Sequence, residues 1–342
     1  MNAERTPVVI QMVVHNAASW LPDVLVSVRE QSYPDIRLLV LDNASTDDTV
    51  AVINRLMPSA RIIRGDSNIG YWAGTEELLS HDDAPYVLAL TDVVLDRHFI
   101  ERGVAFFREH PDTGAVQSVM LQATWTSSGL RKETRVDSLG FAISRSRRIV
   151  NEGHGDESYS VSEPKDIFAV EGAAPFFRRT AIEDCRVNGA WVDPDFRIGP
   201  LGYGDDLDVA WRMHLLGHRQ VLVPSMISWH DRSTTKGTAS GVRDAVSRRH
   251  LRGRIPLLKR QLDWANVRLT MVKNDQVANV VRDLPYILAR EILVFGYTVL
   301  FEPRVFGILP RFVRLLPSMI RKRRVVMARA VTSAAATRRF IT

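Results

Sequence analysis

Short apolar runs alternate with amphipathic segments along the amino-terminal part of the chain. Residues 19–29 and the segment opened by Thr46-Asp47-Asp48 have the apolar spacing and first-turn residues of helices. Buried strands are predicted at 8–14, 36–41, 61–63 and 86–90. Strands that alternate with helices are typical of a doubly wound parallel α/β sheet.

The pattern becomes looser after residue 116. Between 117 and 170 the polar composition predicts a strand or two and a long loop. A compact apolar stretch at 172–179 then leads into a helix near Arg179. A second helix is predicted over 209–216, ended by Gly217, and a strand over 220–223 leads to Trp229-His230.

From about Asp244 the chain is predicted to form successive basic amphipathic helices. The expected breaks are Pro256, Pro285, Pro303, Pro310 and Pro317. The most apolar stretch, 284–301, is interrupted by Arg290 and Glu291, and the remainder is about half of the ~20 residues that a spanning helix needs. The amino terminus also lacks the pattern of a secretory signal. We therefore predict no transmembrane segment.

Charge is unevenly distributed along the 342 residues. After Glu302 there are ten Lys or Arg and no acidic residue, which leaves 35 of the 45 basic residues against all 39 acidic residues. A mildly acidic body with a basic tail predicts an anionic partner. Because the basic residues alternate with long aliphatic runs and no nucleic-acid motif is present, we expect an anionic membrane surface and no nucleic acid.

Polar residues stand at or just beyond the ends of the four predicted strands. They are Asn16, Asp42, Asn68 and Asp92. Open parallel sheets bind ligands outside the carboxyl ends of their strands, so these side chains are predicted to line one crevice. No GxGxxG or P-loop pattern is present, which disfavours the usual dinucleotide and ATP sites. The single cysteine, Cys185, excludes an intrachain disulfide and a multiple-thiolate zinc site.

Asp205 and Asp206 form the most suggestive pair of carboxylates. Two adjacent acidic groups beside a helix start can raise one pKa and supply a base near neutral pH. The alternative is that they only complement the positive end of the helix dipole. Tyr203 and Gly204, directly before them, have the character of a substrate-shaping loop, which favours the functional interpretation.

The chain resembles the family 2 glycosyltransferases, especially the bacterial branch of cell-surface rhamnosyltransferases. The resemblance is carried, in order from about Val8 to His230, by VVIQMVVHN, LLVLDNASTDDT, DSNIGYWAG, LTDVVLDRHFI, GAAPFFRR, GYGDDLDVAWRMHLLGHR and VPSMISWH. The late run LPSMIRKRRVV is similar to the tail of that branch. The resemblance implies a GT-A fold, in which a nucleotide-binding α/β half is fused to an acceptor-binding half.

The resemblance also implies how the donor is bound. Asp42 would contact the base or ribose of the nucleotide sugar, flanked by Asn16 and Asn68. Asp92 would bind the donor through Mg²⁺ or Mn²⁺, although the common DxD motif is reduced here to Thr91-Asp92-Val93. His230 would be a second metal ligand, with a structural histidine as the alternative.

Asp206 would be the general base for the acceptor hydroxyl, and Asp205 would orient substrate, with Asp208 as an alternative contributor. These roles predict an inverting glycosyltransferase that moves rhamnose or another hexose from a nucleoside-diphosphate donor to a hydroxyl of a lipid-linked or cell-surface glycan. Two alternatives remain. A nucleotidyltransferase would have a glycine-rich basic loop after the first strand, where this chain has His15-Asn16-Ala17-Ala18. A catalytically silent, membrane-bound scaffold would agree with the reduced aspartate motif.

Three segments are predicted. Residues 1–116 would form the nucleotide-sugar half and 117–242 the acceptor half of one catalytic domain. Residues 243–342 would form a helical, membrane-associating tail. The expected location is cytoplasmic, peripheral on the inner face of the cell membrane.

Overall fold

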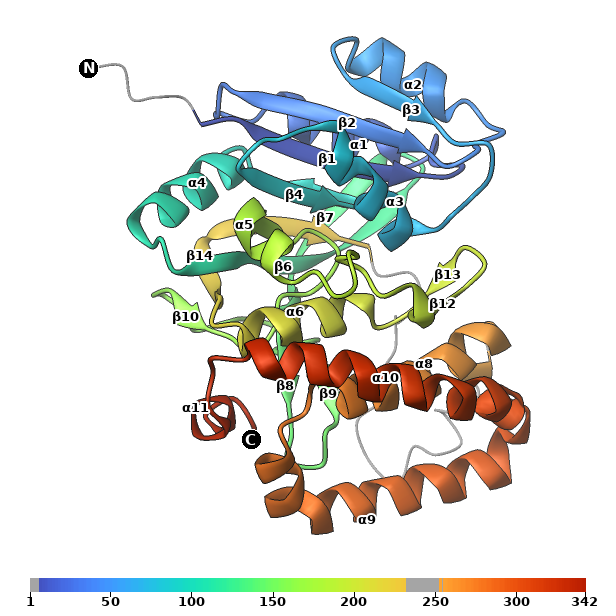
Figure 1. Ribbon diagram of the computed structural model, residues 1–342. Helices are drawn as coiled ribbons and strands as arrows, with labels where there is room; N and C mark the ends of the chain where they lie inside the picture. The colour runs from blue at the N-terminus through green and yellow to red at the C-terminus, as the bar shows by residue number, and fades with distance from the viewer. Residues whose placement is uncertain (1–5, 232–251, 254) are drawn as a thin grey trace.

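The computed structural model describes residues 6–231, 252–253 and 255–342 (Figure 1). The predicted boundary between 242 and 243, and the predicted start of the tail near Asp244, lie outside the described residues. The other predicted boundary, between 116 and 117, lies inside a strand and stays a prediction.

One mixed sheet is the centre of the molecule. Its strands are β1 (Val8–Val14), β2 (Ile36–Asp42), β3 (Arg61–Arg64), β4 (Tyr86–Leu90), β5 (Val93–Leu95), β6 (Thr113–Thr126), β7 (Gly129–Ser138), β10 (Lys165–Asp166), β11 (Phe176–Arg178) and β14 (Arg219–His230). Their order is β10-β14-β6-β11-β4-β1-β2-β3, with β5 beside β14 and β7 beside β6. The small pairs β8 (Phe141–Ile143) with β9 (Ile149–Asn151), and β12 (Arg197–Ile198) with β13 (Leu201–Gly202), lie outside it.

The parallel part of this sheet is buried on both faces. Strands β4, β1, β2 and β3 run parallel, and nearly every residue of β1 and β4 is inaccessible to solvent. One face packs against α1 (Leu21–Arg29), α2 (Thr49–Leu56) and α4 (Phe99–Glu109). The other packs against α3 (Tyr71–Leu78), α5 (Arg179–Asp184) and α6 (Asp205–Leu215). The predicted doubly wound sheet is confirmed, because continuous apolar strands need cover on both sides.

The region 117–170 contains more strand than the sequence predicted. Strands β6 and β7 form a long antiparallel hairpin through Gly129, whose φ of +107° suits glycine at the turn. Polar side chains on the exposed stretches of β7 conceal the alternation that usually marks a strand. The predicted strands are therefore longer than expected, and the long stretch without helix or strand is confined to 152–164.

Two later elements begin or end elsewhere than predicted. Helix α6 begins at Asp205, four residues before the expected start, so both candidate carboxylates lie in its first turn. Strand β14 continues to His230 and is not confined to 220–223. Gly217 ends the helical segment with a φ of +86°, as predicted.

The carboxyl-terminal helices gather at the end of the molecule opposite to β3 and α2 (Figure 1). They are α8 (Leu257–Asn274), α9 (Val277–Phe301), the 3-10 helix η4 (Pro303–Ile308), α10 (Leu309–Arg329) and the short α11 (Ala334–Arg338). Two further 3-10 turns, η1 (Leu79–His81) and η2 (Pro194–Phe196), lie earlier in the chain.

Pro285 and Pro317 do not break the helices, in contrast to the prediction. Pro285 lies inside α9 and Pro317 inside α10. A proline removes one helical hydrogen bond, but tertiary packing holds both sides of each proline in place. Asp283 and Ile287 are buried around the first, and Leu315 and Met319 around the second.

Arg290 and Glu291 do not interrupt the apolar stretch either. Helix α9 is continuous over 25 residues, and among the described helices it alone is long and apolar enough to cross a membrane by length and composition. Only 11% of its most apolar window is buried inside the protein.

Candidate active site

Asn16, Asp42 and Asn68 lie at the carboxyl edge of the parallel strands and shape the loops there. The Asn16 Oδ1 accepts a hydrogen bond from the Thr46 amide at 2.8 Å, and the Asp42 Oδ1 accepts one from the Ser45 amide at 3.0 Å. The Asn68 Oδ1 accepts from the Gly70 amide at 2.9 Å. These bonds are the turn-forming contacts that Asx residues commonly make. Asn16 is exposed, whereas Asp42 is buried.

Asn43 joins two of these loops. Its Nδ2 donates to the Asn68 Oδ1 at 2.9 Å, and its Oδ1 accepts from the Ile69 amide at 2.9 Å. The loop after β2 therefore holds the loop after β3. Gly70 in the second loop has a φ of +88°, and a Cβ there would stand 2.1 Å from the carbonyl oxygen of Pro200. This close approach needs glycine, and it brings the loop against the segment that precedes α6.

Asp92 and His230 meet at the neighbouring strand ends. Strand β14 pairs with β5, so His230 lies opposite Val93, directly after Asp92. The His230 Nε2 is 3.5 Å from the Asp92 Oδ1, and its Nδ1 is 2.9 Å from the Oδ2 of Asp137 on β7. Asp137 is fully buried, whereas about a third of the Asp92 side chain is exposed. One histidine thus stands between a buried and a partly exposed carboxylate.

The two carboxylates determine the charge of this histidine. Burial opposes protonation, but the bonds to Asp137 and Asp92 outweigh it and raise the pKa of His230 to about 10. Burial likewise opposes the charge of Asp92, and His230 outweighs it and lowers the Asp92 pKa. In the protein alone, the pair is therefore an imidazolium with a carboxylate.

Asp206 approaches the same site from α6. Tyr71, the first residue of α3, has its pKa raised by burial first and then by the charges of Glu171, Asp206 and Asp92. The Tyr71 hydroxyl also contacts the Gly172 carbonyl oxygen at 3.4 Å. Three carboxylates from separate parts of the chain therefore act on one partly buried phenol.

Gly172 lets Asp206 come this close. A Cβ at residue 172 would stand 2.9 Å from the Asp206 Oδ2 and 3.0 Å from the Trp72 ring. Any larger residue would push the carboxylate or the ring away. Asp206 is partly exposed, which leaves it accessible to a substrate.

Asp205 differs from its neighbour in being almost completely buried. It is 1% exposed, and neither carboxylate oxygen has a hydrogen-bond partner among the described residues. Burial raises its pKa to about 8; Arg197 opposes this increase, and Asp206 and Asp208 add to it. Asp205 is therefore largely protonated at neutral pH, whereas Asp206 faces the site.

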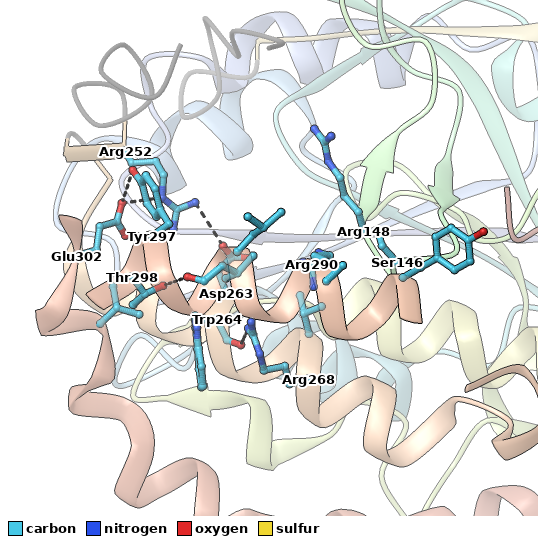
Figure 2. Close-up of a pocket in the computed structure, with 16 residues that line it drawn as sticks. Ser146, Arg148, Arg252, Asp263, Trp264, Arg268, Arg290, Tyr297, Thr298 and Glu302 are labelled. Atoms are coloured by element: carbon cyan, nitrogen blue, oxygen red, sulfur yellow. Dashed lines mark hydrogen bonds and ion pairs between the residues drawn. The ribbon is translucent and has the colours of Figure 1, made fainter. Parts of the chain in front are cut away.

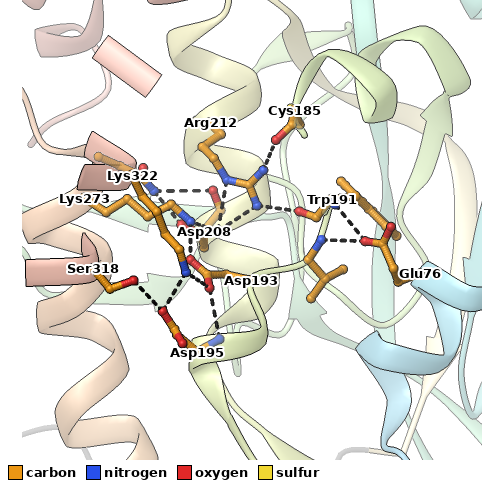
Figure 3. Close-up of polar contacts among 12 residues, drawn as sticks. Glu76, Cys185, Trp191, Asp193, Asp195, Asp208, Arg212, Lys273, Ser318 and Lys322 are labelled. Carbon is orange, nitrogen blue, oxygen red and sulfur yellow. Dashed lines mark hydrogen bonds and ion pairs between the residues drawn. The ribbon is translucent and has the colours of Figure 1, made fainter. Parts of the chain in front are cut away.

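Helix α6 is held by a buried charge network that includes the carboxyl-terminal helices (Figure 3). The Lys273 Nζ of α8 donates to the Asp208 Oδ2 at 2.9 Å and to the Asp193 Oδ2 at 2.7 Å. Arg212, one turn along α6, donates to the same Asp208 oxygen at 2.7 Å. Lys322 of α10 pairs with Asp193. Because Asp208 is fully engaged, it is a structural group of the α6 first turn.

Asp92 and His230 are residue types that bind divalent metal ions, although together they supply only two ligands. The described residues contain no cluster of three or more His, Cys, Asp or Glu side chains placed to hold an ion. However, Asp137 on the Nδ1 side would orient a neutral His230 so that its Nε2 faces the partly exposed Asp92. One oxygen and one nitrogen ligand suit Mn²⁺ or Mg²⁺ if the diphosphate of a donor supplies further oxygens.

The sequence reasoning missed three groups at this site. Asp137 lies in the region predicted as a strand or two and a long loop. Tyr71 and Glu171 carried no signal except that Tyr71 lies within the quoted stretch DSNIGYWAG and Glu171 directly before GAAPFFRR. The two lysines of the charge network, Lys273 and Lys322, were predicted only as part of the basic tail. In each case the interacting residue lies far away in the chain. The periodicity of a segment reports its local structure and not its contacts with distant segments.

Comparisons with known proteins agree with this architecture. Residues 9–184, more than half of the chain, match the family described as Glycosyl transferase family 2. A stretch of 222 residues is 21% identical to the poly-beta-1,6-N-acetyl-D-glucosamine synthase of Staphylococcus epidermidis. It covers 64% of this chain and 48% of that protein, so the chain spans about half the length of this curated relative.

Two solved structures share the fold. TarS 1–349 of S. aureus, in complex with UDP, has a TM-score of 0.55 at 13% identity and aligns over 94% of this chain and 90% of that one. GalNAc-T7 with UDP, GalNAc and Mn²⁺ has a TM-score of 0.56 at 11% identity. The alignment covers 88% of this chain and 59% of that one. The predicted GT-A fold and the predicted family are both confirmed: this chain belongs to glycosyl transferase family 2.

Proposed function

We propose that this protein transfers a sugar from a nucleoside-diphosphate donor to an acceptor hydroxyl, with inversion at the anomeric carbon. The observation that carries the proposal is that Asp206 and Tyr71 both meet Gly172 at one edge of the sheet, where Asp92 and Glu171 also act on Tyr71 and His230 pairs with Asp92. Family membership supports the reaction class, and the two similar structures were solved with UDP.

In this proposal the nucleotide lies over the loops that carry Asn16, Asp42 and Asn68. The diphosphate then extends toward Asp92 and His230. A divalent cation bound by these two residues would supply positive charge beside the leaving diphosphate. The Mn²⁺ in the GalNAc-T7 structure is in accord with this role.

Asp206 acts as the general base. The acceptor oxygen attacks the anomeric carbon, the bond from that carbon to the diphosphate oxygen breaks, and the hydroxyl proton passes to the Asp206 carboxylate. The diphosphate leaves with the bonding electron pair. Asp206 is suited to this step because it is partly exposed and lies beside the buried, protonated Asp205. Asp205 would orient substrate only through its neighbour Asp206, because its own side chain is buried.

Rhamnose from a thymidine diphosphate donor is our proposed substrate, through the resemblance to the rhamnosyltransferase branch, and another hexose is the alternative. The proposed acceptor is a lipid-linked or cell-surface glycan. We further propose a cytoplasmic protein held peripherally on the inner membrane face by its basic tail. The exposed apolar side chains of α9 support this location.

The first experiment is donor binding and hydrolysis across a panel of nucleotide sugars, with and without Mn²⁺. Wild-type protein is expected to bind one donor in a metal-dependent manner, and Asp92→Ala to lose that binding. Asp83→Ala is a matched control, because the Asp83 side chain is 99% exposed and remote from the site. Metal-independent binding, or equal binding by Asp92→Ala, would contradict the proposed role of Asp92.

A further inference from the structure

Helix α9 has two different faces. The face toward the protein carries Asn279, Asp283, Ile287 and Thr298, all buried. The remaining surface of the helix carries large apolar side chains that are 43–73% exposed: Val277, Val281, Leu284, Leu288, Ile292, Leu293, Phe295, Val299, Leu300 and Phe301. Since soluble proteins rarely leave a contiguous apolar surface of this kind uncovered, the face marks an interaction site.

Charged contacts tie the inner face of α9 to the protein along its length. Near its start, Asp283 pairs with Arg145 at 3.0 Å and with the fully buried Arg147 at 2.8 Å. In its second half, Glu291 pairs with Arg268 of α8 at 2.6 Å. To cross a bilayer by itself the helix would have to break these pairs, and leaving buried charges unpaired is strongly unfavourable. The helix is therefore suited to lie in the plane of a membrane.

A cavity of about 820 Å³ opens beside this helix (Figure 2). Its walls come from α8, α9, η4 and the loop at 146–148. Aromatic and aliphatic groups line part of it, among them Trp264, Tyr286, Tyr297 and Leu293. Leu293 is also 73% exposed, so the cavity is continuous with the apolar face of α9.

The polar lining of the cavity carries an excess of positive charge. Arg268 and Arg290 share one carboxylate, Glu291, at 2.6 Å each. Arg148 is exposed, and in the part of the chain that the structure describes its guanidinium has no hydrogen-bond or ion-pair partner. The fourth arginine, Arg252, is balanced by acidic groups: it pairs with Glu302 at 2.8 Å and lies 3.9 Å from Asp263.

We propose that this cavity binds the phosphate head of an anionic phospholipid from the leaflet on which α9 lies. Arg148, Arg268 and Arg290 supply the positive charge that attracts the phosphate, and the acyl chains follow the apolar face past Leu293. Guanidinium groups are good phosphate ligands because their planar donors match its oxygens. The combination of an apolar, in-plane helix with a cationic cavity at its side fits a lipid better than a peptide or a soluble anion. This inference rests on the membrane association in the proposed function.

The cavity is tested with a soluble, short-chain lipid below its micelle concentration, added to the full chain. Dihexanoyl phosphatidylglycerol is expected to bind saturably, and dihexanoyl phosphatidylcholine at least several-fold more weakly. Arg148→Glu is expected to weaken phosphatidylglycerol binding by at least about fivefold, since each basic residue near an anionic lipid contributes on the order of 1 kcal/mol. Arg55→Glu, the same charge change on an exposed position of the remote α2, is the control.

The apolar face is tested with vesicles of phosphatidylcholine, with and without phosphatidylglycerol. Wild-type protein is expected to float with the mixed vesicles, and Ile292→Asp to remain in solution. Val331→Asp, at a position that is 74% exposed but lies outside α9, should float like the wild type. Equal binding of the two short-chain lipids, or equal effects of Arg148→Glu and Arg55→Glu, would overturn the cavity proposal. Flotation of Ile292→Asp at the wild-type level would overturn the in-plane assignment.

Donor binding measured on the same preparations separates the two proposals. If lipid binding fails while a nucleotide sugar still binds, this inference is wrong and the proposed reaction stands. If the lipid binds as expected but no donor does, the proposed reaction is wrong and the lipid site stands. Polyprenyl phosphate is measured as a further probe. If the protein binds it but does not bind phosphatidylglycerol, the choice of a phospholipid is overturned.

Discussion

The neighbouring helices α9 and α10 have opposite relationships with the rest of the protein. Helix α10 directs Leu315, Met319, Lys322 and Val326 inward, and its lysine enters the buried charge network. Helix α9 is the more apolar of the two, yet most of its large side chains face outward. Apolar composition therefore does not decide which helix is buried. The polar contacts decide how each helix docks, and the remaining surface of α9 is left for another partner.

The difference divides the tail into two parts with different tasks. Helices α8 and α10 deliver Lys273 and Lys322 to Asp193 and Asp208, and so hold the first turn of α6 that carries the candidate base. Lys273 and Lys322 together lower the pKa of Asp193, against the opposing effect of burial. The tail thus supports helix α6 on one side and, in our proposal, offers a surface to a membrane on the other.

The largest effect is expected when the buried Lys273 of α8 is replaced. Lys273→Ala leaves two buried carboxylates with one fewer cation, and breaking a buried pair in this way costs about 3–5 kcal/mol of unfolding free energy. Urea unfolding measures it. Lys165→Ala removes a lysine whose side chain is 48% exposed in its pair with Glu152, and should cost less than about 1 kcal/mol. Equal costs for the two variants would mean that the network does not hold α8 to α6.

The next effect compares the stability cost of truncating a buried side chain on α10 with that of truncating an exposed side chain on α9. Met319→Ala on α10 removes a fully buried side chain and should lower the unfolding free energy by about 2–5 kcal/mol. Leu293→Ala on α9 removes one that is 73% exposed and should change it by less than about 0.5 kcal/mol. Thermal or urea unfolding of both variants without lipid makes the comparison. A large loss in Leu293→Ala would show that the outer face of α9 is covered by the protein itself.

The third effect depends on pH and tests how far the charge of the tail reaches along α6. Asp208 has cations from α6 and α8, whereas Asp205, three residues earlier, has a pKa raised to about 8. Between about pH 4 and pH 8 the folded state holds a proton that the unfolded state releases, so this group makes the protein less stable as the pH rises.

Asp205→Asn removes that dependence. The stability of the variant relative to wild type should increase by about 1.4 kcal/mol per pH unit across this interval, and become constant above about pH 8. Denaturant unfolding at several pH values measures the difference. A difference that does not vary with pH would show that Asp205 is ionised in the folded protein, and that the cations of the tail reach it.

Much of the nucleotide half followed from local pattern. Strands 8–14 and 86–90 were predicted with the bounds that the structure has, because a buried strand needs an uninterrupted apolar run. The placing of Asn16, Asp42, Asn68 and Asp92 at strand ends was also predictable. The turn contacts that hold three of them could be expected from residue type, since Asx side chains bond to nearby backbone amides.

The assembly of the candidate site could not be predicted in the same way. His230 and Asp137 are 93 residues apart in the chain, and Lys322 and Asp193 are 129 apart. A charged residue has the same local sequence signature whether it is solvated or buried with a partner. The tail arginines and lysines were therefore interpreted as membrane charge, although Lys273 and Lys322 are internal.

The sequence by itself determined the class of fold, the family and the edge of the sheet where the candidate site lies. Those features depend on short-range periodicity and on residues adjacent in the chain. Only the tertiary structure decided that His230 stands between Asp92 and Asp137, that Asp205 is buried while Asp206 faces the site, and that α9 exposes its apolar face. Burial and charge pairing are set by segments far apart in the chain, and the free energy of a charge depends on what surrounds it in space.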